Sequence, residues 1–349
     1  MSPTMRRWLV HGALVAAAIA APLLFPAFRV QLTMLWIMIV FALTWDLLGG
    51  QMGYNSFGNI AFFGIGVYAG TILQIGLYHD VAAYTSAYGT VTLEFTPAQY
   101  YTGLFVGLAA APLIAVPVAA VLGSGVLGMR GQYFAIATLG LGIAGGELAA
   151  AWGYLGGAFG IQVPVFPGSI ETRRLFFYAL TAGLGLATLW FLGWLYGTRF
   201  GRTLNAIRDD EDKAESMGLR TTRYKTLAWC ISAFFLSLAG GLFGHNIGFI
   251  EPREIAFGAA TFGVWMVLMA ILGGKGTLWG PVLGAVVFYV TKELFWTYLF
   301  GWQRVALGLL IVLIVVFFPV GILGWARRRY PAWFGHRVEA RGAAGSGAQ

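Results

Sequence analysis

Charged residues are scarce in this chain of 349 residues: they make up 10% of it, whereas 58% of the residues are hydrophobic. A soluble domain carries about 25% charged residues, so this chain has too little charge to cover a water-facing surface of its size. Composition therefore excludes a soluble protein and predicts an all-α fold, a polytopic bundle of membrane helices. The net charge of +8 then reflects loops that orient the chain in the bilayer, and we expect no nucleic-acid partner.

Cysteine and histidine are also rare. The single cysteine, Cys230, lies in an apolar run and offers no disulfide within the chain. The four histidines are scattered without the spacing of metal ligands: His11, His79, His245 and His336. We therefore expect no metal site and no cofactor in this chain.

Long apolar runs fill most of the sequence. A hydrocarbon core about 30 Å thick needs about 20 apolar residues per helix. Ten runs are candidates: about 8–26, 30–48, 57–78, 101–127, 131–152, 175–197, 226–250, 258–274, 277–299 and 304–324. The first run has the basic start and small residues of a signal peptide, but it continues to Phe28 and we expect a retained helix. One transmembrane domain over 1–330 is predicted, with a cytoplasmic tail over 331–349 that is disordered at its end.

Basic residues are distributed unevenly between the two sides of these spans. If the N-terminus is cytoplasmic and ten spans alternate, 16 Lys and Arg residues lie inside and 6 lie outside. Cytoplasmic loops are enriched in Lys and Arg, so both termini are predicted to be inside. The loop at 79–100, which contains no basic residue, falls outside.

Glycines and amides interrupt the apolar pattern between the second and third spans. Residues 49–70 contain seven glycines, together with Gln51, Asn55, Ser56 and Asn59. Non-helical backbone at membrane depth is tolerated only where it is buried in protein or lines a cavity, and transporters use such breaks at substrate sites. We expect residues 53–59 to interrupt the helices and line a pathway; the alternative is an ordinary interfacial loop.

A second glycine-rich stretch, residues 128–161, begins with Arg130 and Gln132 and contains Glu147. An ionisable residue inside a span is costly and is a candidate for function; the alternative places Glu147 near the outer end, within reach of water. The predicted substrate pathway combines both stretches: Gly53, Tyr54, Asn55, Phe57, Asn59, Tyr133, Phe134, Thr138 and Glu147.

A third stretch, residues 273–285, resembles a phosphate-binding loop only superficially. The GxxxxGK[ST] motif requires glycine at position 269 and Ser or Thr after Lys275, where Met269 and Gly276 stand. The chain therefore lacks a nucleotide site of this type, and any use of ATP requires a partner.

The longest basic connection runs from Thr198 to Lys225. Its core places four apolar residues near one helical face and ends in a helix-stopping glycine: Leu204, Ile207, Ala214 and Met217, then Gly218. The pattern predicts a cytoplasmic coupling helix over 204–218 that buries this face in an ATPase groove. The alternative is a solvated amphipathic loop helix.

Four segments, in order over about residues 30–325, carry a family resemblance: "GQMGYNSFGNIAFFGIGVYAG", "RGQYFAIATLGLG", "GRTLNAIRDDEDKAESMGLRTTRYK" and "GGKGTLWGPVLGA". They resemble the signature segments of LivM-type permeases, the membrane subunits of branched-chain amino acid ABC importers. Residues 212–218, "DKAESMG", also resemble the EAA-x-x-x-G signature of importer permeases, which adds Asp212 to the predicted coupling residues.

The resemblance implies a multi-pass permease subunit of the bacterial inner membrane that performs no chemistry. It implies a second, LivH-type permease subunit, two cytoplasmic ATPase subunits that bind ATP and Mg, and a periplasmic or lipid-anchored substrate-binding protein; membrane lipid surrounds the spans. The cargo would be branched-chain or other small hydrophobic amino acids, with urea, short amides or organic acids as the alternative. An ion-coupled secondary transporter would need ionisable residues at the midplane and no ATPase-docking helix, so the sequence argues against it.

Overall fold

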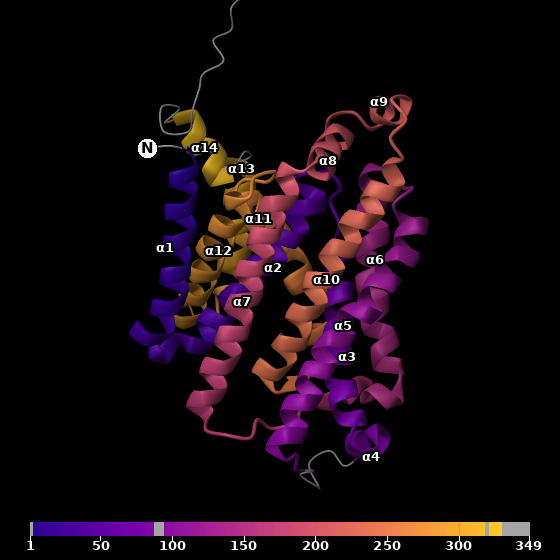
Figure 1. Cartoon of the computed structure of the whole chain (residues 1–349), viewed down its shortest axis with the longest axis vertical. Coiled ribbons are helices and arrows are strands. Elements are labelled where there is room, and N and C mark those ends of the chain that lie inside the picture. Colours follow the sequence, from indigo (N-terminus) through magenta and orange to yellow (C-terminus); the bar gives the residue numbers. More distant parts are fainter. Residues whose placement is uncertain (1–2, 87–93, 300, 318–320, 330–349) are drawn as a thin grey trace, which may run out of the picture.

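The computed structural model describes residues 3–86, 94–299, 301–317 and 321–329, and these are almost entirely helical (Figure 1). The helices in chain order are α1 (Pro3–Leu24), η1 (Pro26–Phe28), α2 (Arg29–Gly49), α3 (Asn59–Gly76), α4 (Val81–Ser86), α5 (Pro97–Val126), α6 (Gly131–Ala151), η2 (Gly153–Leu155), η3 (Gly157–Phe159), α7 (Ile170–Gly197), α8 (Arg199–Asp209), α9 (Glu211–Ser216), α10 (Thr221–Ile247), η4 (Pro252–Ala256), η5 (Ala259–Gly263), α11 (Val264–Gly273), α12 (Trp279–Tyr298), α13 (Gln303–Phe317) and α14 (Gly321–Arg329). Within the described residues, the only strands are β1 (Ile161–Gln162) and β2 (Phe249–Ile250), which pair antiparallel. The predicted all-α membrane bundle is confirmed.

Among the described residues, seven segments are long and apolar enough to cross a membrane: Pro26–Gly49, Asn59–Gly76, Pro97–Val126, Gly131–Ala151, Ile170–Gly197, Thr221–Ile247 and Pro252–Gly273. The other three predicted spans correspond to α1, α12 and α13, which are shorter or less apolar. The prediction of one helix over 304–324 is wrong, because α13 ends at Phe317 and α14 begins at Gly321. Gly321 has a φ of +74°, a left-handed conformation that a continuous right-handed helix excludes.

The eighth predicted span, 258–274, begins earlier and less regularly than expected. It starts at Pro252 with two π-helical segments, η4 and η5, and becomes α-helical only at Val264. Pro252 lacks a backbone N–H, and the carboxylate of Glu251 accepts the N–H of Arg253 at 2.9 Å. π-helical turns often occur at functional sites. The apolar pattern of the sequence did not reveal this irregular start.

α10 lies at the centre of the bundle and packs against α2, α3, α5 and α7. Glycines allow α3 and α10 to touch through their backbones: a Cβ on Gly66 would collide with the carbonyl of Ser237, and one on Gly240 with the carbonyl of Phe63. In a bilayer, helices associate through such close packing, since lipid tails are as apolar as the side chains. This contact holds α3, and the chain just before it, against the buried core.

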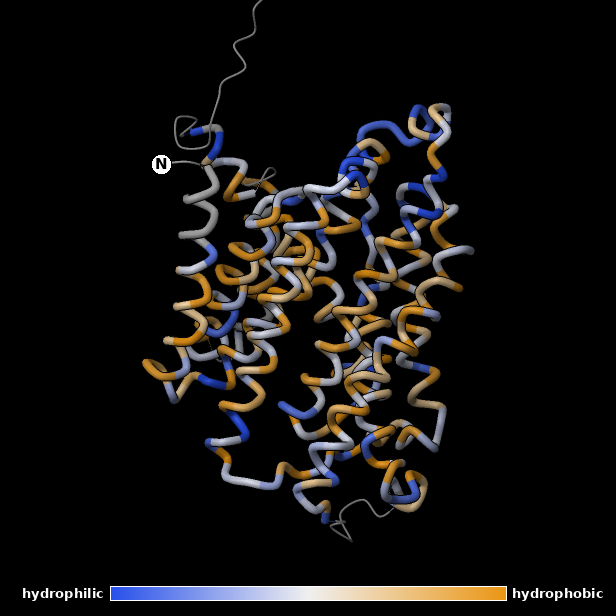
Figure 2. Tube along the Cα trace, viewed as in Figure 1, coloured by the Kyte–Doolittle hydropathy of each residue, from blue (hydrophilic) through white to orange (hydrophobic). Residues whose placement is uncertain are grey.

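Polar residues gather at the two ends of the bundle, whereas hydrophobic residues follow the middle of the helices (Figure 2). α8 and α9 project from one end, where the start of α1 and α14 also lie, while α4 lies at the opposite end (Figure 1). The first and last described helices thus both reach the end that carries α8 and α9, in agreement with the predicted orientation. The predicted tail over 331–349 lies outside the described residues.

Labelling of single cysteines tests which end is cytoplasmic. In a Cys230→Ala background, Ala82→Cys in α4 and Ser216→Cys in α9 place one thiol at each end of the bundle. Because basic residues are concentrated around α8 and α9, a membrane-impermeant maleimide applied to spheroplasts should label Ala82→Cys alone. Ser216→Cys should react only after the membrane is permeabilised. Equal labelling of both from outside would contradict the orientation.

Candidate functional site

The chain between α2 and α3 is non-helical over residues 50–58, and Asn59 is the first residue of α3. Gly53 has a φ of +82°, a conformation that favours glycine. Two hydrogen bonds hold this backbone in place. Trp45 Nε1 donates to the carbonyl of Ser56 at 2.8 Å, and the N–H of Phe57 donates to Thr138 Oγ1 at 3.1 Å. Residues 50–58 are thus a fixed non-helical connection between two spans, and their role in lining a pathway stays a prediction; below we call residues 50–58 the interruption.

Asn59 lies fully buried where the interruption meets α3. Its Oδ1 accepts hydrogen bonds from Trp229 Nε1 at 3.0 Å and from Ser56 Oγ at 3.1 Å. Within the described residues its Nδ2 has no hydrogen-bond partner. A buried amide that keeps one unused donor is unusual in a folded protein, so this end of α3 has an unsatisfied polar group next to the interruption.

A pocket of about 510 Å³ opens beside the interruption. Its lining comes from three places, the interruption, the start of α6 and the α8–α9 segment: Met52, Gly53, Tyr54, Asn55, Arg130, Gly131, Gln132, Ala135, Ile207, Arg208, Asp209, Asp210 and Glu211. Three of the predicted pathway residues, Gly53, Tyr54 and Asn55, line it directly. Basic and acidic side chains both face this pocket, so it presents the two signs of charge that a zwitterion carries.

α6 brings two further predicted residues to the interruption. The ring of Phe134 lies 5.2 Å from that of Tyr54 in an edge-on arrangement, and Thr138 accepts the N–H of Phe57. A Cβ on Gly58 would lie 3.0 Å from the Cβ of Thr138. The interruption and α6 are thus in close contact at Gly58 and Thr138.

Two predicted pathway residues lie elsewhere, and the structure corrects their placement. Tyr133 is 78% exposed on α6. Glu147 lies 13 residues beyond Phe134, which is about 20 Å along a helix. There it forms an ion pair with Arg253, with both Nε and Nη2 at 2.9 Å from its carboxylate oxygens. Of the two alternatives for Glu147, the structure favours the one that places it toward the far end of its span.

The cytoplasmic connection is two helices, not the single coupling helix predicted over 204–218. The break is at Asp210, which has an extended backbone and caps α9 by accepting the N–H of Lys213 at 3.0 Å. Two adjacent aspartates before a helical run are the N-cap signal that could have revealed this break. Gly218, with a φ of +87°, ends the segment as expected.

The prediction that a partner buries this apolar face is also wrong for three of its four residues. Leu204, Ile207 and Ala214 are buried by this chain's own helices, because the break turns α8 and α9 onto the bundle. Met217 alone of the four is open to solvent, with 83% of its surface exposed. A partner can therefore reach Met217 but not the other three residues.

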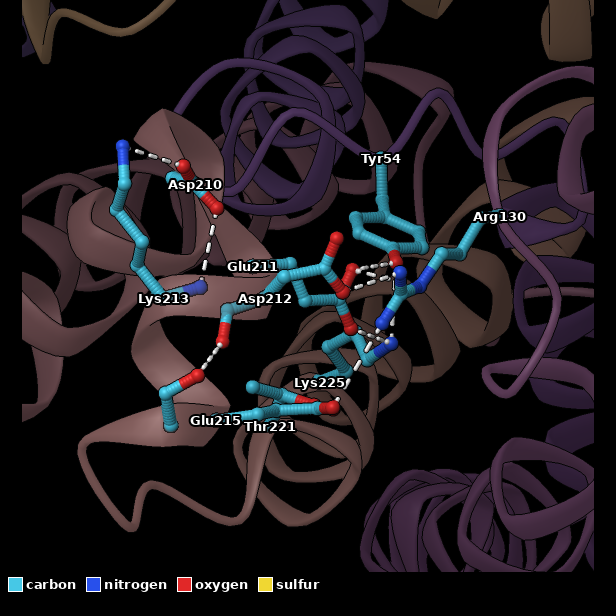
Figure 3. Close-up of polar contacts among 10 residues, drawn as sticks. Tyr54, Arg130, Asp210, Glu211, Asp212, Lys213, Glu215, Thr221 and Lys225 are labelled. Carbon is cyan, nitrogen blue, oxygen red and sulfur yellow. Dashed lines mark hydrogen bonds and ion pairs between the residues drawn. The ribbon is translucent and has the colours of Figure 1, made fainter.

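The first residue of α9, Glu211, reaches inward to a buried group of polar atoms (Figure 3). Lys225 Nζ donates to Glu211 Oε1 at 2.6 Å and to the Tyr54 hydroxyl at 3.1 Å, and the Tyr54 hydroxyl donates to Glu211 Oε2. The side chain of Lys225 is 2% exposed and that of Glu211 is 12% exposed. Sequence reasoning identified Tyr54 but missed its two partners, since no local pattern marks them.

Arg130 joins the same group from the solvent side. Its guanidinium lies 2.7 Å from Asp212 Oδ1, 3.6 Å from a Glu211 oxygen and 3.7 Å from a Glu215 oxygen. Its side chain is about half exposed, and Asp212, the coupling residue suggested by the sequence, is more exposed still. Ion pairs so open to water contribute little, because solvent and salt screen them.

The protonation states follow from these contacts. Burial disfavours the charged form of Glu211, but hydrogen bonds from Lys225 and Tyr54 and the charge of Arg130 outweigh it, so the pKa of this carboxyl lies below its usual value. Burial and the neighbouring Glu211 raise the pKa of Tyr54. Near neutral pH, Glu211 is therefore an anion and Tyr54 a neutral hydroxyl that donates to it.

Comparison with known proteins identifies the family. The model of the branched-chain amino acid transport system permease component matches residues 27–318. The chain belongs to this permease family. It is 27% identical, over 93% of its length and 76% of the relative's, to the high-affinity branched-chain amino acid transport system permease protein LivM of Salmonella typhimurium.

Two other relatives match shorter parts of this permease. The high-affinity branched-chain amino acid transport system permease protein LivH of Salmonella typhimurium is 31% identical over 46% of this chain and 50% of its own. The autoinducer 2 import system permease protein LsrC of Yersinia pseudotuberculosis is 31% identical over 34% of each chain. No solved structure matches the chain. This permease is therefore a multi-pass protein of the bacterial inner membrane and a permease component of a transport system.

The hydroxyl of Thr138 provides a direct test of the contact between the interruption and α6. Thr138→Val keeps the shape of the side chain but leaves the Phe57 N–H without an acceptor, which should cost about 1–3 kcal/mol. We expect a lower thermal unfolding midpoint for the detergent-solubilised permease. Thr138→Ser retains the hydroxyl and is the matched control. Equal midpoints for Val and wild type would show that this hydrogen bond does not hold the interruption.

Proposed function

We propose that this chain is the membrane-spanning permease subunit of an ATP-binding-cassette importer that translocates branched-chain or other small hydrophobic amino acids. The observation that carries the proposal is its similarity to LivM over 93% of the chain, together with the family match over 27–318. The chain supplies a path through the membrane and leaves the chemistry to its partners.

The proposed partners follow from the same comparison. A second, LivH-type permease subunit completes the path, and similarity to both LivM and LivH supports a pair of related subunits. Two cytoplasmic ATPase subunits bind ATP and Mg and dock at the end of the bundle that carries α8 and α9. A periplasmic or lipid-anchored binding protein delivers the cargo at the opposite end.

The interruption and the pocket beside it form the cytoplasmic part of the proposed path. Amide side chains such as Asn55 and Asn59 are polar without adding charge, which suits a zwitterion that must bind weakly and leave. At the pocket, Arg208 pairs with Asp209, and Asp210 pairs with Lys213, so a zwitterion there would meet charges of both signs that already have partners. The mixed charges then release the cargo to water instead of trapping it.

The cargo alternative remains urea, a short amide or an organic acid carried by the same machinery. A relative named for autoinducer 2 import supports keeping it, because members of this family differ in the cargo their names record. Uptake by the complete transporter in proteoliposomes distinguishes these cases. We expect ATP-dependent accumulation of labelled leucine that unlabelled valine inhibits and that urea, acetamide and lactate do not.

The uptake experiment tests the cargo and the transporter class separately. Accumulation of urea, acetamide or lactate instead of leucine would contradict the proposed amino-acid cargo but support the ATP-driven importer class. Uptake by this chain alone, driven by an ion gradient and independent of ATP, would overturn the importer class in favour of a secondary transporter.

Docking of the ATPase can be tested at Met217, the exposed apolar residue just after α9. Met217→Asp places a charge where an apolar contact with the ATPase is proposed, and it should reduce ATPase recovery with the tagged permease and ATP-driven uptake together. Met217→Leu keeps the apolar surface and should retain both. Unchanged recovery of the ATPase with Met217→Asp would place the docking surface elsewhere. Ala214→Asp is unsuitable, because Ala214 is buried within this chain.

A further inference from the structure

α9 is a six-residue helix tied to three separate parts of the bundle by acidic side chains. Glu211 contacts Tyr54 in the interruption and Lys225 near the start of α10. Asp212 pairs with Arg130 just before α6. Glu215 accepts the hydroxyl hydrogen of Thr221, the first residue of α10, at 2.5 Å. A small helix at the surface thus contacts the interruption, the residue just before α6 and the start of α10.

These connections differ in how firmly they can hold. The contacts of Asp212 are open to water and are screened. The Glu211–Lys225 pair is shielded, and each of its charges also bonds to the Tyr54 hydroxyl. Separating a shielded, hydrogen-bonded pair leaves an uncompensated buried charge, so these groups move together or not at all.

The Tyr54 end of this connection lies within the interruption. Tyr54 follows Gly53, and its ring packs on Phe134 of α6 and under the Lys225 ammonium at 4.5 Å from the ring centre. At the other end, the extended backbone of Asp210 separates α9 from α8, so the two helices do not form one continuous rod. A push on α9 therefore reaches the interruption and α6 through one buried contact.

We propose that Tyr54, Glu211 and Lys225 are positioning residues that transmit movement of α9 to the interruption and so couple the partner ATPase to opening of the cytoplasmic end of the path. This inference rests on the proposed function as an ATP-driven importer. It assigns a role to Glu211 and Lys225, and it places transmission in their buried contact with Tyr54 and not in the exposed charges of α9.

The experiment compares cargo moved per ATP hydrolysed by the complete transporter in proteoliposomes. Tyr54→Phe removes one oxygen and keeps the ring; Glu211→Gln and Lys225→Met remove the charges. In each variant we expect the ratio to fall by about tenfold, within the range of coupling between distant sites. ATP hydrolysis and recovery of assembled complex should stay close to wild type, which a merely structural defect would not leave intact.

Lys213→Met is the matched control. Lys213 pairs with Asp210 at 2.8 Å, a distance close to that of Lys225 from Glu211, but its side chain is 81% exposed. Lys213 lies on α9 with Glu211, whereas Lys225 lies on α10. Lys213→Met removes the same charge as Lys225→Met but leaves the buried contact intact, so its transport ratio should stay at the wild-type value. An equal fall in Lys213→Met and Lys225→Met would show that cytoplasmic charge matters and the buried contact does not.

The other possible outcomes of the transport-ratio experiment also test the inference. If Lys225→Met fails to assemble, Tyr54→Phe carries the test, because it keeps both charges and the packing of the ring. An unchanged transport ratio in Tyr54→Phe and Glu211→Gln overturns the inference while leaving the importer intact. If the wild-type complex shows no ATP-driven uptake of any cargo, the proposed function itself fails, which is a different result.

Discussion

Every break in a membrane helix leaves backbone donors and acceptors that lipid cannot satisfy, and this requirement shapes the permease. Most of the chain meets it with helices. At the interruption, a tryptophan from α2 and a threonine from α6 provide the missing partners. At the start of the eighth span, the Glu251 carboxylate does so. A break can therefore exist only where neighbouring helices already surround it, and this ties the interruption to α2, α3 and α6.

The glycine contacts explain why this arrangement stays in place. α3 meets α10 at backbone distance through Gly66 and Gly240, and α10 in turn packs on α2, α5 and α7. The first turn of α3 is fixed to the same core, since Asn59 bonds to Trp229 of α10. The interruption thus has one anchored end at α3. The other contacts, with α6 and α9, are made by single side chains and are the ones able to change.

Much of the fold could be predicted from sequence because lipid imposes a local rule, an apolar run of sufficient length for each helix. The interruption was also predictable, since Gly53 and Asn55 stand out against their apolar surroundings. The Glu211 contacts were not, because Tyr54 and Lys225 lie 171 residues apart and no periodicity links them. The prediction for the coupling segment was wrong for another reason. Helical spacing placed Leu204 and Ala214 on one face, but the cap at Asp210 starts a new helix and both side chains turn inward.

The buried pair of Glu211 and Lys225 calls for a reason beyond stability. Replacing such a pair with apolar residues of similar size is often neutral or stabilising, and an apolar contact would fill the same space. Apolar packing is not directional, so it permits neighbouring surfaces to slide. Hydrogen bonds are directional: the Lys225 ammonium bonds to one carboxylate oxygen of Glu211, and the Tyr54 hydroxyl bonds to the other. A helix that must pass a movement to a particular residue needs a fixed register with that residue. The charged pair provides that register.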